Sequence, residues 1–258
     1  MSVKRFYVWA ILAAILFLFG LFSGHDWTLY AYRMAALQNP EIYSRFMKFP
    51  VTFLCMVLAW IALKDAFNRT DNLKLGVAYS IIVLGDIVFF FDVHSIIGVF
   101  CFALAHLTLI YRNATGIKSY RHKGALWSIL PLILAFSLAL MFLVFYPMLK
   151  DNLPYFSTLL GYAIIISGSL WAAIAALIIG YFPRANAVLI VTGVACFFLS
   201  DVCVGFYRSL PADYNRVFAM YITWIFYAPA LVLTSLSGYN LKKIFNGSPY
   251  PQTLSCGR

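Results

Sequence analysis

Long runs of apolar residues, separated by short polar segments, fill most of the chain. A helix needs about 20 such residues to cross the hydrocarbon core of a bilayer. The pattern predicts eight membrane-spanning helices, at residues 6–22, 47–63, 73–91, 96–111, 126–146, 155–179, 185–206 and 217–236. The expected fold class is therefore an all-α membrane protein, an eight-transmembrane-helix bundle in which residues 1–245 form a single domain.

Two polar segments fall outside these runs. Residues 23–45 are predicted to form a loop between the first two helices, and residues 246–258, rich in Gly, Pro and Ser, are predicted to be a disordered tail. Lys4 and Arg5 precede the first run, as in a signal peptide, but no small-residue cleavage pattern follows it. The first run is therefore predicted to be a retained membrane span.

The composition supports a membrane protein and excludes other classes. Of the residues, 63% are hydrophobic and 11% are charged, whereas about 25% are charged in a typical soluble domain. The net charge is +10, but the basic residues form short clusters beside the apolar runs, which is typical of membrane-flanking loops and argues against a nucleic-acid partner. The five cysteines form no Cys-x-x-Cys pair, so they are predicted to be small core residues rather than a disulfide framework.

The basic residues also predict an orientation. If the N-terminus is cytoplasmic, most of the 19 Lys and Arg residues fall on the cytoplasmic side, as the positive-inside rule requires. With an even number of spans, both termini are then predicted to be cytoplasmic. The sequence leaves open whether the membrane is a bacterial inner membrane or the endoplasmic reticulum, and it leaves the oligomeric state open as well.

Two aspartates, Asp86 and Asp201, lie inside predicted spans. A carboxyl group at membrane depth costs about 3 kcal/mol unless it is paired, neutralised or in contact with water. Neither aspartate has an oppositely charged residue one helical turn away, so any partner must come from another helix. Both spans are predicted to run outward, which places each aspartate roughly 8 to 9 Å below the outer interface. The shared depth predicts one polar cluster inside the bundle.

Other polar residues are candidates for the same cluster. His106 lies in the span after Asp86, roughly 15 Å from the outer end of that span, and Lys48 lies at the outer end of the second span. Tyr79, Tyr221 and Tyr227 also lie in the spans and offer hydroxyl groups. A tyrosine can satisfy a buried carboxyl group without any catalytic role, so a purely structural cluster is the alternative. Two acids at one depth beside a histidine favour the functional interpretation.

The two halves of the chain are weakly similar. Leu84-Gly85-Asp86 in the third span matches Leu199-Ser200-Asp201 in the seventh, and Phe102-Ala103 matches Phe218-Ala219. The small residue before each aspartate allows neighbouring helices to approach closely. The pattern predicts two four-helix halves related by duplication.

Four motifs carry a family resemblance. They are Lys48-Phe49-Pro50, Leu84-Gly85-Asp86, Phe102-Ala103-Leu104-Ala105-His106 and Phe198-Leu199-Ser200-Asp201. In their order and spacing they resemble the YhhN family of membrane lysoplasmalogenases, over somewhat more than half of the chain. The chain departs from the family at Leu109, where a tyrosine is frequent, and at Ala230, where a glutamine is frequent. These departures bear on substrate preference more than on chemistry.

The resemblance implies a hydrolase that cleaves the vinyl ether bond of a lysoplasmalogen, releasing a fatty aldehyde and glycerophosphoethanolamine or glycerophosphocholine. It implies a lysophospholipid substrate and bilayer lipids as partners, and no cofactor and no bound metal. The family's two aspartates correspond to Asp86 and Asp201. The head group and chain length preferred are not readable from the sequence.

The implied reaction suits two carboxyl groups. A vinyl ether breaks when a carbon atom is protonated, and water then captures the oxocarbenium ion. Burial favours the neutral form of a carboxyl group, which can act as the acid, while a second carboxylate stabilises the cation and activates water, by analogy with glycosidases. The sequence leaves open which of Asp86 and Asp201 is the acid. His106 is expected to orient one of them, and Lys48 to hold the phosphate or else to serve as an interfacial anchor.

Two other functions are compatible with the sequence. A zinc-dependent intramembrane hydrolase needs about three protein ligands, and the histidines available are His106 and His94, with His25 and His122 in predicted loops. A transporter of lipids or small solutes is the second, because Pro131 and Pro229 interrupt two spans and duplicated halves are common in transporters. Release of aldehyde from lysoplasmalogen, with and without a chelator, distinguishes the three.

Overall fold

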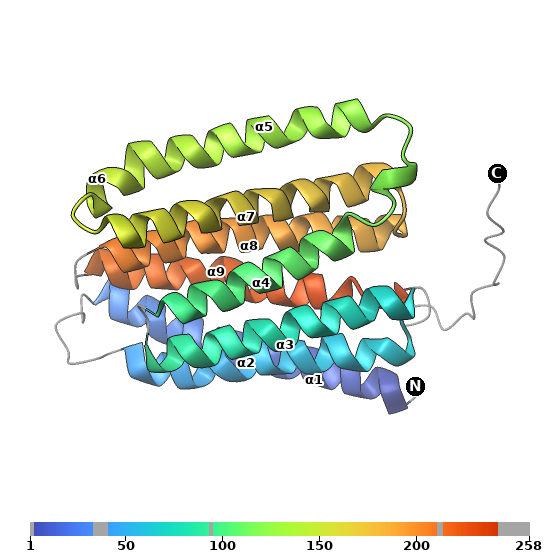
Figure 1. Ribbon diagram of the computed structural model, residues 1–258. Helices are drawn as coiled ribbons and strands as arrows, with labels where there is room; N and C mark the ends of the chain where they lie inside the picture. Colours follow the sequence, from blue (N-terminus) through green and yellow to red (C-terminus); the bar gives the residue numbers. More distant parts are fainter. Residues whose placement is uncertain (1–2, 33–40, 93–94, 211–213, 242–258) are drawn as a thin grey trace.

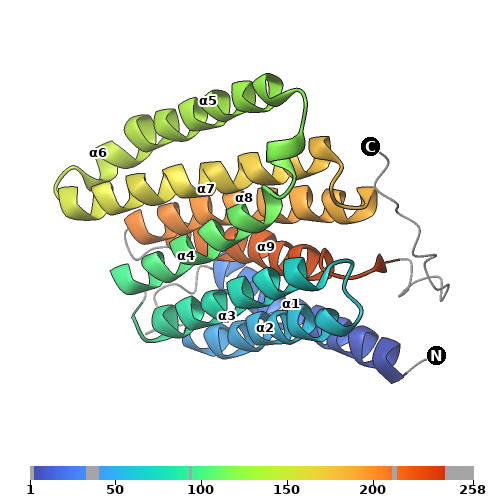
Figure 2. The same ribbon diagram turned by 45° about the vertical axis from the view of Figure 1, so that its right-hand side comes forward.

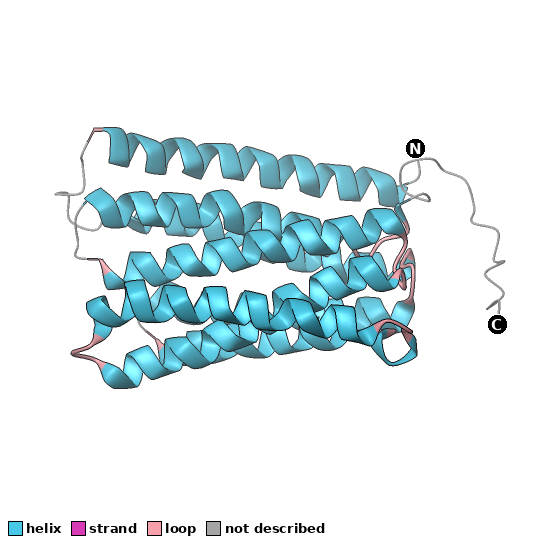
Figure 3. Ribbon diagram, turned by 90° about the horizontal axis from the view of Figure 1, so that it is seen from above, coloured by secondary structure: helices cyan, strands magenta, loops and turns pink. Residues whose placement is uncertain are grey.

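The structure is a computed structural model that describes residues 3–32, 41–92, 95–210 and 214–241. Long helices run side by side along one direction, as the view from above shows most clearly (Figure 3). They are α1 (Val3–Ala31), α2 (Glu41–Ile61), α3 (Arg69–Phe91), α4 (Ile96–Asn113), α5 (Lys123–Leu140), α6 (Tyr146–Leu149), α7 (Leu153–Ile179), α8 (Arg184–Ser209) and α9 (Tyr214–Leu236). A π-helical segment, Met141–Phe145, joins α5 to α6, so these three form one continuous rod.

The helices assemble around α4, α8 and α9 (Figure 1). The most extensive packing joins α8 to α9 and α3 to α4. Helix α4 also packs on α7, and α9 on α1 and α2, so the two halves of the chain meet in the middle of the bundle. Helix α5 lies at the edge, against α7 (Figure 2). The first residue of α1 and the last of α9 lie at the same end of the bundle.

Within the described residues, seven helices are long and apolar enough to cross a membrane. The remaining predicted span coincides with α2, whose apolar run, Phe46–Ile61, is shorter. Large apolar side chains cover the outside of the bundle, including Leu16, Phe17, Leu132 and Leu143, as in a helix bundle surrounded by lipid. The protein therefore fits an integral multi-pass membrane protein, and the crossing by α2 stays a prediction.

The loop predicted at residues 23–45 is wrong at both of its ends. Helix α1 continues without interruption through Ser23 and Asp26 to Ala31, and α2 already begins at Glu41. The polar residues do not end α1 because Asp26 is fully buried and has a partner inside the bundle. The predicted tail at 246–258 lies outside the described residues.

Two predicted spans are also too short. Helix α8 runs on past Phe206 to Ser209, and it thereby carries Arg208 on its last turn. The rod that begins with α5 starts at Lys123 and passes through Pro131 without a break, while α9 passes through Pro229. The interruptions expected at these two prolines for a transporter are therefore not observed.

A buried ion pair closes the end of the bundle where α1 begins and α9 ends. Arg112, at the end of α4, donates to Asp71 in the first turn of α3, with its Nε 3.0 Å and its Nη2 2.9 Å from Oδ2 of Asp71. Nη1 of Arg112 donates to the hydroxyl group of Ser237 just after α9, at 2.8 Å. The amide group of Asn186 in α8 donates to the carbonyl oxygen atoms of Ser237 and Tyr239. Four helix ends are thus held together by satisfied polar groups.

Small residues allow the closest helix pairs to approach. A Cβ atom at Gly85 in α3 would lie 2.8 Å from the ring of Phe102 in α4, and one at Gly193 in α8 would lie 2.3 Å from the hydroxyl oxygen of Thr234 in α9. Both distances are too short for a side chain. The pairs α3–α4 and α8–α9 occupy equivalent places in the two halves of the chain. Their similarity accords with a duplication, which stays a prediction.

Candidate active site

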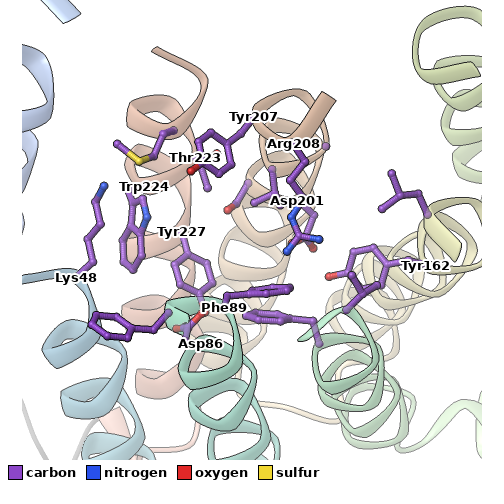
Figure 4. A pocket seen from close by; sticks show the side chains of 18 of the residues that line it. Lys48, Asp86, Phe89, Tyr162, Asp201, Tyr207, Arg208, Thr223, Trp224 and Tyr227 are labelled. Atoms are coloured by element: carbon purple, nitrogen blue, oxygen red, sulfur yellow. Dashed lines mark hydrogen bonds between the residues drawn. The ribbon is translucent and has the colours of Figure 1, made fainter. Parts of the chain in front are cut away.

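A pocket of about 180 Å³ lies in one half of the bundle, near the end where α2 begins and α3 ends (Figure 4). Its wall consists of side chains from α2, α3, α4, α7, α8 and α9. Most of this wall is aromatic or aliphatic, with Phe89, Phe102, Trp224 and Tyr227 among the largest side chains. Six helices therefore enclose an apolar pocket at one end of the bundle, which is the usual form of a small-molecule site.

The side chains of Asp86 and Asp201 both line this pocket. They come from α3 and α8, the helices in which the sequence places the matching Leu-Gly-Asp and Leu-Ser-Asp motifs. The structure therefore brings the two acids to one cavity, although each is held by its own partners. Gly85 and Ser200, which precede them, are buried and face neighbouring helices or the pocket.

Asp86 is surrounded by neutral groups. The hydroxyl group of Tyr227 in α9 donates a hydrogen bond of 3.0 Å to Oδ2 of Asp86. The fully buried Thr52 of α2 is a second neighbour of the same carboxyl group. Both partners are uncharged, and Phe89 and Phe102 complete the apolar wall around them. Among the described residues, Asp86 thus has a hydrogen bond from Tyr227 and no positively charged group in contact with its carboxyl group.

Asp201 has a histidine beside it. Nε2 of His106 in α4 lies 3.2 Å from Oδ2 of Asp201, and Nδ1 of the same ring lies 3.1 Å from the hydroxyl oxygen of Ser169 in α7. The approach of Nε2 to Asp201 is a close contact rather than an aligned hydrogen bond, since Oδ2 of Asp201 has no hydrogen-bond partner among the described residues. His106 and Ser169 are buried behind the pocket wall. This chain of contacts orients Asp201 from outside the cavity.

Tyr162 of α7 lies on the pocket side of Asp201, with its hydroxyl group turned toward the carboxyl group (Figure 4). Its ring also packs edge-on against His106, with the ring centroids 6.0 Å apart. A second, smaller cavity of about 40 Å³ shares Leu159, Tyr162 and Asp201 with the first and reaches the π-helical segment after α5. The pocket therefore has an apolar side branch next to Asp201.

Lys48 lines the pocket but is already paired. Its Nζ lies 2.5 Å from Oδ2 of Asp26 in α1, and both side chains are almost completely buried. The ammonium group also lies 5.6 Å from the ring centroids of Phe22 and Trp224. The sequence predicts Lys48 at the membrane interface and Asp26 in a loop. It predicts neither the burial of Lys48 nor its ion pair with Asp26. The ion pair joins α1 to α2 at the pocket wall.

Arg208, on the last turn of α8, also lines the pocket. It is 9% exposed, and its guanidinium group lies over the ring of Phe89, 4.1 Å from the centroid. The predicted span ends at Phe206, which leaves Arg208 outside the membrane helices. A usable signal was present, since Arg208 follows Asp201 by seven residues, which places both on the same face of a helix.

Two of the candidate tyrosines lie elsewhere. The hydroxyl group of Tyr79 donates to the carbonyl oxygen of Leu231 and does not line the pocket. The ring of Tyr221 packs against Trp27 of α1, with 5.6 Å between the ring centroids. Of the three tyrosines, Tyr227 is the one that contacts an aspartate.

Tyr162, Thr52 and Ser169 are the site residues for which the sequence offered no pattern, because their partners lie on helices distant in the chain.

The histidines proposed as zinc ligands do not gather. His106 faces Asp201 and Ser169, His25 lies in α1 next to Asp26, and His122 precedes α5. His94 lies outside the described residues. In the described parts of the chain, no three His, Cys, Asp or Glu side chains are grouped as metal ligands.

The comparison with protein families decides the assignment. The model of the YhhN family matches residues 43–237, about three quarters of the chain. The chain belongs to the YhhN family. No curated protein and no solved structure matches it significantly. Membership confirms the resemblance inferred from the motifs at Lys48, Asp86, His106 and Asp201, and it supports a hydrolase.

The matched region covers α3, α4, α7, α8 and α9 completely and thus both pocket aspartates. Helix α1 precedes the matched region, so Asp26, the partner of Lys48, lies outside it.

Proposed function

We propose that this YhhN protein is a lysoplasmalogenase, which hydrolyses the vinyl ether bond of a 1-alkenyl lysophospholipid to a fatty aldehyde and glycerophosphoethanolamine or glycerophosphocholine. The observation that carries the proposal is the presence of Asp86 and Asp201 in one mostly apolar pocket within a membrane bundle. Carboxyl groups at this depth are costly, and those found in membrane spans usually mark a functional site. A substrate with one long hydrocarbon chain and a polar head group suits a pocket at the end of such a bundle.

The reaction needs one proton donor and one carboxylate. The acid transfers a proton to the alkenyl carbon that is not bonded to oxygen, and the electron pair of the double bond forms the new C–H bond. The resulting oxocarbenium ion is attacked at its carbon by water, which loses a proton to the carboxylate. The hemiacetal formed then collapses to the aldehyde and releases the glycerol oxygen as a hydroxyl group. Atoms balance with one water consumed, and no oxidant or metal enters the sequence.

We assign the acid to Asp86 and the base to Asp201. Asp86 accepts a hydrogen bond from Tyr227 on Oδ2 and has neutral surroundings, which favour a carboxyl group that carries its proton. Asp201 faces Nε2 of His106, which favours a carboxylate that can stabilise the positive charge of the transition state. His106 acts through Asp201 and is a positioning residue. The rest of the alkenyl chain is proposed to lie in the apolar side branch of the pocket beside Tyr162.

The orientation predicted from the basic residues adds a location. With both termini cytoplasmic, the pocket lies toward the outer face of the membrane, because it is at the end of the bundle opposite the start of α1. The membrane is proposed to be a bacterial inner membrane or the endoplasmic reticulum. Bilayer lipids are expected to surround the exposed apolar side chains of the bundle.

The purified full-length protein in detergent is expected to release aldehyde from 1-alkenyl lysophosphatidylethanolamine. The matched control substrate is the 1-alkyl analogue, which has the same chain and head group without the double bond, and it should give no aldehyde because it cannot be protonated to an oxocarbenium ion. Activity should persist in EDTA, since the proposed acid and base are carboxyl groups. Aldehyde is measured by coupling to an alcohol dehydrogenase.

Three results would count against the proposal. Absence of aldehyde from the alkenyl lipid in both detergent and liposomes would exclude the reaction. Loss of activity in EDTA, with recovery on adding zinc, would support the metal-dependent hydrolase instead. Release of a fatty acid from a 1-acyl lysophospholipid at the same rate would indicate a lysophospholipase.

A further inference from the structure

Arg208 is a buried cation with unusual surroundings. It lies on the last turn of α8 and lines the pocket, and 9% of its surface is exposed. Its flat face stacks on Phe89 at 4.1 Å. Nη1 points to the hydroxyl group of Tyr155 at 3.5 Å, the outer limit of a hydrogen bond, and the buried Nε has no hydrogen-bond partner. The guanidinium group therefore has several donors that the protein does not use.

Other buried cations of the described structure show what is missing. Lys48 has the carboxylate of Asp26 at 2.5 Å, and Arg112 has the carboxylate of Asp71 at 2.9 Å together with Ser237. Among the described residues, Arg208 forms no ion pair with a carboxylate. A buried charge without a counter-ion is costly, and the planar fork of Arg matches the oxygen atoms of a phosphate group. The guanidinium group of Arg208 is therefore arranged to bind an anionic group of a ligand.

We propose that Arg208 binds the phosphate of the lysophospholipid head group and thereby sets the position of the vinyl ether bond between Asp86 and Asp201. The inference rests on the proposed function for the identity of the lipid, whereas the phosphate site itself depends only on Arg208 and the pocket. It also moves this role away from Lys48, the residue expected from the sequence to hold the phosphate, because Lys48 is neutralised by Asp26.

Depth in the membrane agrees with this placement. Arg208 lies next to the end of α8 at Ser209, while Asp201 lies two helical turns deeper. A lysophospholipid has its phosphate at the membrane interface and its alkenyl bond below the glycerol. The head group can therefore stay near the surface while the reactive bond reaches the acids.

Distances along the ligand agree as well. The seven residues from Asp201 to Arg208 separate their Cα atoms by about 10 Å along the helix axis. The carbon attacked by the water that Asp201 activates is separated from phosphorus by six bonds, and an extended chain advances about 1.2 Å per bond, which gives roughly 7 Å. A hydrogen bond from the guanidinium group to a phosphate oxygen spans the remainder. One extended substrate can thus contact both residues.

The test is a binding measurement with lipids that cannot react. The 1-alkyl lysophosphatidylethanolamine and the 1-alkylglycerol of the same chain length differ only in the phosphoethanolamine group. Wild-type protein is expected to bind the phospholipid about 10- to 100-fold more tightly, the effect of charge-assisted hydrogen bonds. Arg208→Gln should abolish this preference and leave the affinity for alkylglycerol unchanged, while Arg208→Lys should keep part of it.

The control variant is Arg216→Gln. Arg216, in α9, also stacks on an aromatic ring, that of Tyr207 at 4.8 Å, but it does not line the pocket. This variant should bind both lipids like the wild type. Inorganic phosphate at millimolar concentration should not displace the phospholipid, and displacement would mean that the site takes free phosphate rather than a lipid head group.

Two outcomes would overturn the inference. If Arg208→Gln and Arg208→Lys, each with the melting temperature of the wild type, kept the full preference for the phospholipid, Arg208 would not bind the phosphate. If Arg208→Gln weakened both lipids equally, its role would be structural. Binding that depends on Arg208, in a protein that releases no aldehyde from any alkenyl lipid, would refute the proposed reaction and retain the phosphate site.

Discussion

Asp86→Asn is expected to lower kcat for aldehyde release about 100-fold or more, because it removes the proposed proton donor. Asparagine has nearly the same shape and can still accept the hydrogen bond that Tyr227 gives to Asp86, so the fold and the pocket should be preserved. The affinity for the unreactive 1-alkyl lysophospholipid should therefore change little. Rates come from the coupled aldehyde assay, and affinities from the binding measurement described for Arg208.

A neighbouring aspartate provides the control for Asp86. Asp92 caps the same helix, α3, is exposed, and does not line the pocket. Asp92→Asn should retain wild-type kcat and KM. If Asp86→Asn kept normal turnover, or if it lost activity only together with lipid binding, the assignment of Asp86 as the acid would have to be abandoned.

Asp201→Asn is expected to lower kcat by about 100- to 1,000-fold, the effect of removing one preorganised electrostatic contact from a transition state. His106→Gln should cost less, about 10-fold, because His106 touches Asp201 and not the substrate. The double variant should be no slower than Asp201→Asn alone, since residues that act as a unit give non-additive effects. Asp151→Asn, an exposed residue between α6 and α7, is the matched control.

The pattern across these variants separates positioning from packing. If His106 only filled space, the cost of His106→Gln would be as large in the Asp201→Asn background as in the wild type. Additive losses would thus contradict the role given to His106. A rise in KM with unchanged kcat for Asp201→Asn would show that this carboxylate binds the lipid rather than the transition state.

The positions of the helices along the chain are largely readable from the sequence because lipid imposes one strong rule. Every backbone polar group in the hydrocarbon must be satisfied within a helix, so the apolar runs give the spans directly. The errors occurred at ends. Ser23 and Asp26 look like loop residues, yet α1 continues through them because Lys48, distant in sequence, provides a partner for Asp26. Local composition contains no information about such a contact.

The site was readable in part for a related reason. Asp86 and Asp201 stand out because an acid in an apolar span is expensive, and His106 stands out as a rare polar residue beside them. Tyr162, Thr52 and Ser169 are common residue types, and their roles follow from packing between helices. Arg208 was not a candidate because the predicted span ends at Phe206, whereas helix α8 continues to Ser209 and includes this buried cation. Tyr79 is a candidate only because it lies in the same helix as Asp86. Its hydroxyl group donates to the carbonyl oxygen of Leu231 instead.

The two buried ion pairs illustrate a further limit. Asp26 with Lys48 and Asp71 with Arg112 each join helices that are adjacent in the bundle, and neither pair has a spacing typical of one helix face. Removal of one member of a buried pair generally costs about 3–5 kcal/mol. Such pairs therefore contribute to the stability of the bundle and must be distinguished from Asp86 and Asp201, which have no ion pair with Lys or Arg among the described residues.

The central claim is that a carboxylic acid in this pocket protonates the alkenyl carbon and that water then captures the same two-carbon unit. It is tested most directly by running the reaction in deuterium oxide enriched in oxygen-18, trapping the aldehyde at once as a hydrazone, and analysing both products by mass spectrometry. The account predicts one deuterium on the carbon next to the aldehyde and no oxygen-18 in the glycerophosphoethanolamine. Oxygen-18 in the glycerol product, or an aldehyde without deuterium, would contradict it.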